Sequence, residues 1–295
     1  MRVAAGIVLY YPDFERLEEN LLSVAPQVEE IFVYINGIDR ISAIPQCVDM
    51  VIVEKSATNV GLAKALNSLC YEAAYRTYDY ILILDQDSVV SEGMVHELLR
   101  FQGEKVGIVA PTIIDRNTNV EFFAEDSVRR VDRVITSGSL VSLAAWKAVG
   151  GFDERLFVDW VDFEFNAALR LHGYCVLQSA NTSLLHEMGR REPAFSVPMI
   201  KKHQIRRVTL YRTNHSLVRH RDRGRSWGYM LKKYRGTTVY SSELRCIFKN
   251  TIRDIVIERR KIAITAQKVL GYREGKKLYK QQFVSEIERP NKLHN

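Results

Sequence analysis

Residues 80–90 read YILILDQDSVV, a segment that indicates a buried strand followed directly by acidic side chains. A run of strand-forming, mostly apolar residues leads into Asp85 and Asp87, which are separated by one residue. Side chains at positions i and i+2 of an extended chain point to the same side. The segment therefore predicts a site for a cationic or polar ligand at the end of this strand.

Strand-like and helix-like patterns alternate before this segment. The ranges that read as strands are 3–11, 30–36 and 48–55, and those that read as helices are 14–27 and 61–76. This alternation predicts an α/β fold with a mainly parallel, Rossmann-like central sheet that helices cover on both faces. Ligands of such sheets bind beyond the carboxyl ends of the strands. The two aspartates lie where such a site is expected.

The pattern changes after residue 88. Residues 106–115 and 120–126 read as further strands, 157–174 as a helix, and 174–187 as one or two strands. Beyond about residue 198 the strand signals nearly stop, and from residue 241 onward the apolar residues follow helical spacing. We expect one enzyme domain over residues 1–215 and a basic, helical C-terminal region over residues 216–295.

The charge of the chain is divided unevenly along its length. The 295 residues carry a formal net charge of +7, which is −11 over residues 1–199 and +18 over residues 200–295. Such asymmetry indicates two segments with different partners. No run of about 18 uninterrupted apolar residues is present, so we expect no membrane-spanning helix. The four cysteines show no paired spacing, which indicates a reduced, cytoplasmic environment.

Four motifs follow one another in an order that is more specific than any one of them. They are NVGLAKALN (59–67), YILILDQDS (80–88), TSGSLVSLAAWKAVGGFDERLFVDWVDFEFNAALRLHGY (136–174) and LLHEMG (184–189). In this order the chain resembles glycosyltransferase family 2, and more narrowly its bacterial rhamnosyltransferases, in which the paired-aspartate motif commonly reads DQDS. The resemblance covers roughly residues 3–220. It implies a GT-A fold, a nucleotide-activated sugar donor, a divalent cation and inversion at the anomeric carbon.

The resemblance also implies roles for individual residues at the donor site. Asp85 is expected to contact the ribose or the sugar, and Asp87 to ligate Mg²⁺ or Mn²⁺ at the donor diphosphate. His186 is expected to reach the same metal, although a single histidine after an apolar strand is also common as a structural residue. Other donor contacts are expected at loop mouths, where packing or helix capping is the alternative for each. These residues are Tyr10, Asn36, Asn59 and Gly61.

The stretch VDFE at 161–164 takes the place of the acidic catalytic motif of the family. Asp162 falls at the position of the catalytic base, and Asp159 is its rival. Trp160 and Glu164 are expected to bind or orient the acceptor. An inverting transfer needs a base because the acceptor hydroxyl must lose its proton as it attacks, and such a group contributes about 10²–10⁴-fold. The alternative is an acidic first turn that interacts favourably with the helix dipole.

The basic C-terminal region contains clusters such as RHRDRGR (219–225), KKYR (232–235) and ERRK (258–261), interleaved with aromatic residues. No nucleic-acid-binding module is recognisable and the acidic body would repel phosphate backbones, so we expect no nucleic-acid partner. A basic amphipathic segment fits an anionic membrane surface. A solvated surface around an oligomerisation core is the alternative, and a homo-oligomer stays open.

These observations lead to one expected function. It is the transfer of L-rhamnose from dTDP-L-rhamnose to a polyprenyl-diphosphate-linked saccharide during surface polysaccharide synthesis (O-antigen, capsule or cell-wall glycan), by a cytoplasmic enzyme bound peripherally at the inner face of the cell membrane. Galactofuranosyl and other hexosyl donors remain alternatives, because the sugar depends on the DQDS resemblance alone. A nucleotidyltransferase would usually show a glycine-rich phosphate loop after the first strand, and LYYPDFE shows none. An inactive membrane-associated binding protein would be expected to lack the acids at 85, 87 and 162.

Overall fold

A computed structural model describes residues 1–37, 44–116, 128–187, 192–201 and 204–287. Contacts divide the chain into two compact units, Met1–Glu187 and Met188–Asn295. The predicted domain boundary at 215/216 remains a prediction, because a domain must also be able to fold on its own. The strand predicted at 120–126 lies outside the described residues.

The first unit is built on one mixed sheet with the strand order β3-β2-β1-β4-β8-β6-β9-β5, and β7 pairs with β9 beside this path. The first four strands of that order run parallel to one another, and β8 joins them to the parallel pair β6 and β9 in antiparallel orientation. The strands are β1 (Val3–Leu9), β2 (Glu30–Asn36), β3 (Val51–Ser56), β4 (Tyr80–Asp85), β5 (Val89–Val90), β6 (Val106–Asp115), β7 (Val128–Arg130), β8 (Ser139–Ser142) and β9 (Cys175–His186).

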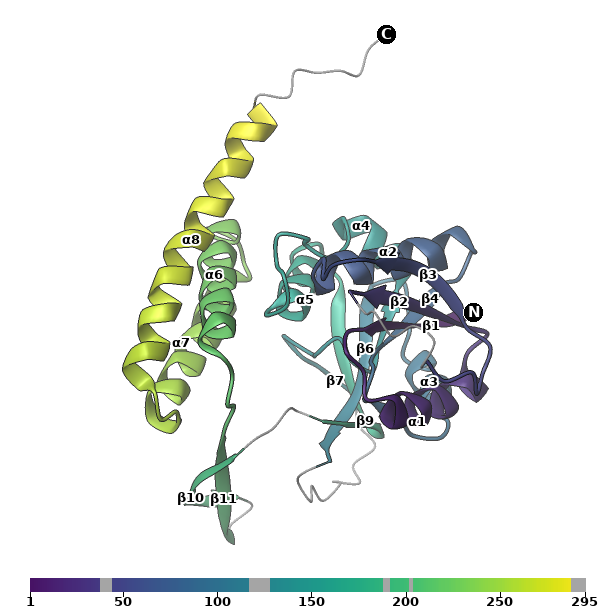
Figure 1. Cartoon of the computed structure of the whole chain (residues 1–295), viewed down its shortest axis with the longest axis horizontal. Helices are drawn as coiled ribbons and strands as arrows, with labels where there is room; N and C mark the ends of the chain where they lie inside the picture. Colours follow the sequence, from purple (N-terminus) through teal and green to yellow (C-terminus); the bar gives the residue numbers. More distant parts are fainter. Residues whose placement is uncertain (38–43, 117–127, 188–191, 202–203, 288–295) are drawn as a thin grey trace. The chain divides into compact units, whose positions relative to one another are not determined.

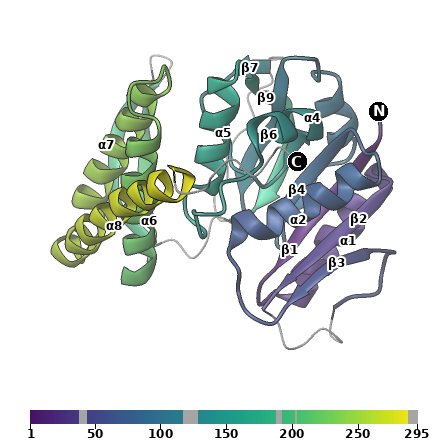
Figure 2. The same ribbon diagram turned by 90° about the horizontal axis from the view of Figure 1, so that it is seen from above.

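Helices cover both faces of this sheet, as the alternating pattern predicts (Figure 1). The helices are α1 (Phe14–Val24) with the short 3₁₀ helix η1 (Ala25–Gln27), α2 (Leu62–Tyr75), α3 (Met94–Leu99), α4 (Leu143–Val149) and α5 (Val161–Leu171). Asp13 begins α1, because its carboxylate accepts hydrogen bonds from the backbone N–H groups of Glu15 and Arg16. Figure 2 shows α2 crossing the parallel strands on the face opposite α1.

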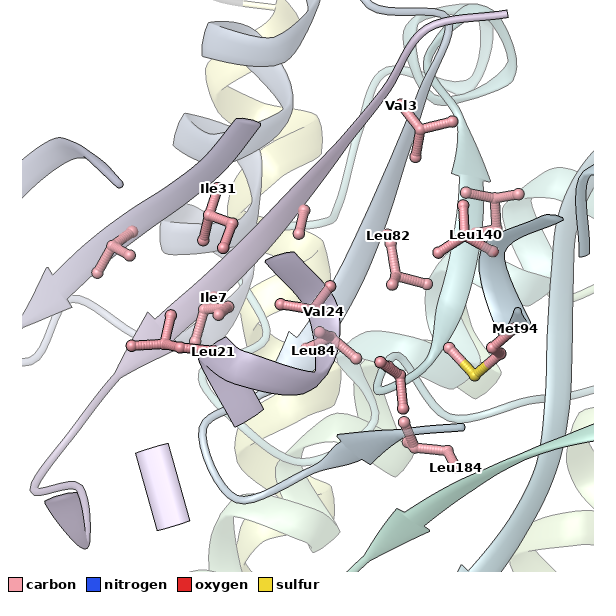
Figure 3. Packing of buried hydrophobic residues seen from close by; sticks show 14 of the residues in the cluster. Val3, Ile7, Leu21, Val24, Ile31, Leu82, Leu84, Met94, Leu140 and Leu184 are labelled. Carbon is pink, nitrogen blue, oxygen red and sulfur yellow. The ribbon is translucent and has the colours of Figure 1, made fainter. Parts of the chain in front are cut away.

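The core lies between these strands and the helices α1 and α3 (Figure 3). Alternate residues of β1 and β4, among them Ile7 and Leu84, pack against Leu21 of α1 and Met94 of α3. The intervening residues of the same strands face α2, where Gly6 lies against Ile81 and Leu69. Burial on both faces explains why these strands read as continuous apolar runs rather than as an alternating pattern.

The parallel strands bring the predicted donor residues to one edge of the sheet. In the strand register, Val8 pairs with Asp85 of β4, and Leu9 pairs with Ile35 of β2. The chain after β1, the end of β2 and the end of β4 therefore lie side by side. This is the carboxyl edge at which α/β sheets bind ligands.

The second unit contains a hairpin and three helices. The hairpin consists of β10 (Glu192–Lys201) and β11 (Gln204–Arg212), and the helices are α6 (Leu217–Lys233), α7 (Tyr240–Ile257) and α8 (Lys261–Ile287). The helices expected in this region are confirmed. The expectation that strands end near residue 198 was wrong, since β10 and β11 extend to residue 212. The hairpin was missed because its sequence contains Pro193, Pro198 and several arginines and lacks the apolar pattern typical of strands. Among the described residues, no helix is long and apolar enough to cross a membrane.

Helices α6 and α8 pack through glycine at the same spacing on each partner. Gly224 and Gly228 of α6 face the backbone of α8, and Gly271 and Gly275 of α8 face the backbone of α6. Residues four apart lie on one face of a helix, so each pair forms a flat strip. A Cβ atom at any of the four would collide with backbone atoms of the other helix. This packing requires glycine.

Candidate active site

Three potential metal-ligating groups converge at the carboxyl edge of the sheet. Asp85 ends β4, Asp87 follows it, and His186 ends β9. His186 Nδ1 lies 3.4 Å from Asp87 Oδ1, and His186 Nε2 lies 3.8 Å from Asp85 Oδ2. One ligand atom from each of the three residues lies within 4.8 Å of the others. The His186 side chain is 11% exposed and that of Asp85 is 44% exposed, so the cluster has a buried base and an open side.

Two buried serines hold this cluster together. Ser88 Oγ lies 3.0 Å from His186 Nδ1 and 2.8 Å from Ser137 Oγ. Ser137 Oγ in turn accepts a hydrogen bond of 2.9 Å from the backbone N–H of Asp85. The imidazole of His186 is thereby connected to the backbone that carries the first aspartate.

The electrostatics of the cluster fit a bound cation. Burial lowers the pKa of His186, but its hydrogen bond to Asp87 and the charges of Asp85, Asp87 and Asp115 outweigh burial, so the pKa is raised above its ordinary value. Asp87 Oδ1 is buried, and His186 Nδ1 lies 3.4 Å from it. A buried carboxylate oxygen is costly unless a donor or a positive charge faces it. Carboxylate oxygens with an imidazole form a donor set that suits Mn²⁺ or Mg²⁺.

The second acidic group lies at the start of α5. Trp160 adopts a left-handed backbone conformation with φ of 74° just before the helix, and Asp162 Oδ1 accepts a 2.8 Å hydrogen bond from the N–H of Phe163. Asn166 stabilises this turn, because its side-chain amide donates hydrogen bonds to the carbonyl oxygens of Asp162 and Val134. Trp160 and Glu164 are buried, so they present little surface to a ligand, and their expected acceptor contacts remain predictions.

The carboxyl group of Asp162 is tuned for proton transfer near neutral pH. Burial raises its pKa, and the negative charges of Asp159 and Asp85 raise it further, to about 7. A general base works best when its pKa lies near the working pH. Because the charge of Asp85 acts on the pKa of Asp162, the acidic group at the start of α5 lies close enough to the strand-end cluster to interact with it.

A buried asparagine of the NVGLAKALN motif positions the loop that leads to α5. Asn67 Oδ1 accepts hydrogen bonds from Phe152 N at 2.9 Å and Trp146 Nε1 at 3.1 Å. Its amide nitrogen donates to the Phe152 carbonyl oxygen at 2.9 Å. The end of the same loop lies against Gly61, where the N–H of Leu62 donates to the carbonyl of Phe157. The first motif thus orients the acidic stretch almost a hundred residues later.

The two predicted donor-binding asparagines contact each other. Asn36 donates from Nδ2 to Asn59 Oδ1 at 3.0 Å, and its Oδ1 accepts from the backbone N–H of Val60 at 2.8 Å. Asn59 Oδ1 also accepts from the N–H of Gly61. These bonds shape the loop at the carboxyl ends of β2 and β3. The role of Asn36, Asn59 and Gly61 in binding a donor remains a prediction.

Tyr10 is exposed at the mouth of the site and is tied to the paired-aspartate motif. Gln86, the residue between the two aspartates, accepts from the N–H of Tyr10 at 2.8 Å and donates to its carbonyl oxygen at 3.0 Å. Sequence reasoning gave no role to Gln86, Ser88 or Ser137. The sequence marked these three residues only by their position, because all three lie inside the motifs on which the family resemblance depends.

Comparison with known proteins agrees with this geometry. Residues 7–153 match the model of the family described as glycosyl transferase family 2. A curated relative, the dTDP-rhamnosyl transferase RfbF of Shigella flexneri, is 24% identical over 209 residues, which cover 63% of this chain and 69% of that protein.

Solved structures share the fold. The structure of S. aureus TarS 1-349 in complex with UDP-GlcNAc superposes with a TM-score of 0.61 at 13% identity, covering 96% of this chain and 92% of that one. The structure of GalNAc-T7 with UDP, GalNAc and Mn²⁺ gives a TM-score of 0.52 at 13% identity, covering 63% of this chain and 43% of that one. The expected GT-A fold is confirmed, and the nucleotidyltransferase alternative loses its support. The chain is a glycosyltransferase and belongs to glycosyltransferase family 2.

Proposed function

We propose that this enzyme transfers L-rhamnose from dTDP-L-rhamnose to a lipid-linked saccharide, with inversion at the anomeric carbon. The observation that carries the proposal is the meeting of Asp85, Asp87 and His186 at the carboxyl edge of the sheet, in the electrostatic field of Asp162. The choice of rhamnose is supported by the relative that is named a dTDP-rhamnosyl transferase.

The strand-end cluster is proposed to hold the donor. Asp87 and His186 would ligate a divalent cation, and such an ion offsets the negative charge that develops on the leaving nucleoside diphosphate. Asp85, the most exposed of the three, would contact the ribose or the sugar. Tyr10 is 46% exposed at the same edge and offers a ring on which a pyrimidine base can stack.

Asp162 is proposed to be the catalytic base. Its carboxylate takes the proton of the acceptor hydroxyl while the hydroxyl oxygen forms a bond to C1 of the sugar. The bond between C1 and the diphosphate oxygen breaks on the opposite side, which inverts the configuration. The negative charge of Asp159 helps to raise the pKa of Asp162. A higher pKa makes the ionised carboxylate of Asp162 a stronger base.

The acceptor is proposed to be a polyprenyl-diphosphate-linked saccharide at the inner face of the cell membrane, with L-rhamnose becoming part of a surface polysaccharide. The strongly basic C-terminal unit supports this part of the proposal, because a positive surface is attracted to anionic lipids and diphosphates.

Titration calorimetry with dTDP-L-rhamnose tests the donor, with Mn²⁺ present and with the metal chelated. We expect dTDP-L-rhamnose to bind more tightly with the metal than without it, and UDP-GlcNAc, UDP-galactofuranose and dTDP-glucose to bind more weakly. The Asp87→Asn variant keeps the shape of the side chain and should lose the metal-dependent gain. Tighter binding of another nucleotide-sugar would overturn the rhamnose assignment and leave the transferase in place.

Product analysis tests the stereochemistry and the activity itself. An NMR spectrum of the product of a lipid-linked acceptor should show the anomeric configuration opposite to that of the donor. A protein that binds the donor with metal but turns over no acceptor and hydrolyses no donor would instead be an inactive binding protein.

A further inference from the structure

Helix α7 carries an apolar face that no described residue of the second unit covers. Its side chains are Leu244, Phe248, Ile252, Ile255 and Val256, and each is between 43% and 63% exposed. These positions follow the helical repeat and form one arc. Among the residues that α7 buries, Ile247, Asp254 and Ile257 lie on a different side of the helix. We call the five exposed residues the α7 face.

A row of cations borders this face. Arg245, Lys249 and Arg253 recur every four residues, so they lie side by side along one flank of the arc. Arg253 also donates to the carbonyl oxygen of Tyr211, which fixes its position without removing its charge. At the carboxyl end of the helix the exposed residues Arg259, Arg260 and Lys261 continue the positive border.

The apolar arc continues into a hollow between α7 and α8. This groove has a volume of about 370 Å³, and Ile255 belongs to both the face and the groove wall. Ile264 and Val269 of α8 form the opposite wall, and the exposed cations Arg273 and Lys276 also line it. Asp254 and Lys268, which are paired with each other, add no net charge to the lining.

We propose that the α7 face binds the surface of an anionic phospholipid membrane. The five apolar side chains enter the acyl layer, the groove between α7 and α8 accommodates hydrocarbon from one lipid, and the bordering cations contact phosphates. An amphipathic helix with aromatic and aliphatic residues on one side and Lys/Arg beside them is suited to such an interface. This inference rests on the proposed function only for its biological purpose, which is access to a lipid-linked acceptor.

Charge argues against a second copy of this chain as the occupant. Residues 200–295 carry a formal charge of +18, and two copies joined through the same face would bring like-charged borders toward each other. An anionic lipid surface has the opposite charge and supplies the apolar layer as well.

Co-flotation of the full chain with vesicles tests the inference. We expect binding to vesicles of phosphatidylglycerol and phosphatidylcholine, little binding to phosphatidylcholine alone, and weaker binding in 1 M salt, where screening shortens the reach of charge to about 3 Å. The Phe248→Ser, Ile252→Ser double variant should bind at least about tenfold more weakly, because it removes two apolar side chains from the inserted set. Tyr75→Ser is the matched control, because Tyr75 is exposed on α2 of the other unit, and it should bind like the parent.

Two measurements separate the possible failures. Calorimetry with dTDP-L-rhamnose should give the same affinity for the parent and the double variant, since the donor groups lie in the first unit, so a lost donor site cannot imitate a lost lipid site. Analytical ultracentrifugation reports whether the face joins two copies. The inference is overturned if the double variant floats like the parent, if the parent does not float, or if the double variant only converts a dimer into a monomer.

Discussion

Ser88 Oγ lies 3.0 Å from His186 Nδ1 and is itself 2.8 Å from Ser137 Oγ. When the imidazole donates its Nδ1 proton to Ser88, Nε2 is left with a free electron pair on the side of Asp85. The orientation of a ligating histidine is usually fixed by such a partner on its other nitrogen. The serines are therefore positioning residues for the metal site.

Replacing the serine next to the histidine should weaken metal binding. We expect Ser88→Ala to lower the affinity for Mn²⁺ in the presence of dTDP by about 10–100-fold, because the ring loses the group that orients it. Electron paramagnetic resonance of free Mn²⁺ measures this without turnover. Ser91→Ala is the control, because its hydroxyl contacts Thr182 rather than His186. Equal affinity in Ser88→Ala and Ser91→Ala would show that the ring needs no such support.

Asp162 and Asp159 can be distinguished by their effect on turnover. We expect Asp162→Asn to bind donor normally and to lose about 10²–10⁴-fold in kcat, because an amide cannot accept the acceptor proton. Asp159→Asn removes a charge that raises the Asp162 pKa, so its kcat/KM profile should move to lower pH while turnover survives. In the parent, kcat/KM should rise with pH and level off above about 7, where Asp162 is ionised. The opposite pattern in the two variants would make Asp159 the base.

The same raised pKa predicts a gain of stability on neutralising Asp162. Its pKa in the folded protein is about 7, above the ordinary value of 3.8, so the native state holds a proton that the unfolded chain releases. Stability from this group is complete below pH 3.8 and is lost as the pH rises through 7. Asp162→Asn should raise the Tm at pH 8 by several degrees, because a pKa of about 7 against 3.8 corresponds to at most about 4 kcal/mol, and should leave the Tm at pH 4 nearly unchanged. Thermal unfolding at both pH values checks this, and an equal shift at both would contradict it.

The sequence predicted the parts of the fold that depend on local pattern. The apolar runs of β1, β2 and β4 mark strands buried on both faces, and their parallel order places Asp85 at the ligand-binding edge. Contacts between distant residues could not be found in this way. Asn67 supports the loop after Trp146 although about eighty residues separate them, and Ser137 supports the backbone of Asp85. Such hydrogen bonds depend on tertiary packing, and no local pattern in a single sequence predicts which distant residues will meet.

In the second unit, too, the sequence pattern predicted only part of the structure. The hairpin of β10 and β11 escaped prediction because its residues are polar and interrupted by proline, while the helices were predicted from the apolar spacing of α7. That spacing does not say which apolar residues are covered. Ile247 is buried and Phe248 beside it is exposed, and the packing of α6 and α8 against α7 decides between them.

A buried ion pair joins α7 and α8. Asp254 and Lys268 are paired, with side chains 4% and 7% exposed, and the ammonium group of Lys268 also lies over the ring of Trp227. Burial lowers the pKa of Lys268 and Asp254 opposes that shift. We expect Asp254→Ala to lose about 3–5 kcal/mol in urea unfolding, because it leaves a buried charge without a partner. The double variant Asp254→Leu, Lys268→Met should recover most of the loss, and a double variant no more stable than Asp254→Ala would contradict this.

The glycine strips between α6 and α8 allow a sharper test of packing. A methyl group at Gly275 would collide with the carbonyl oxygen of Arg225, and backbone cannot move aside as a flexible side chain can. We therefore expect Gly275→Ala to destabilise the helical unit by about 1–3 kcal/mol, even though alanine is the better helix former by about 1 kcal/mol. Gly103→Ala is the control, because its added Cβ would have only ordinary contact with Val106. Urea unfolding followed by circular dichroism measures both, and a Gly275→Ala variant as stable as the parent would mean that α6 and α8 do not pack backbone to backbone.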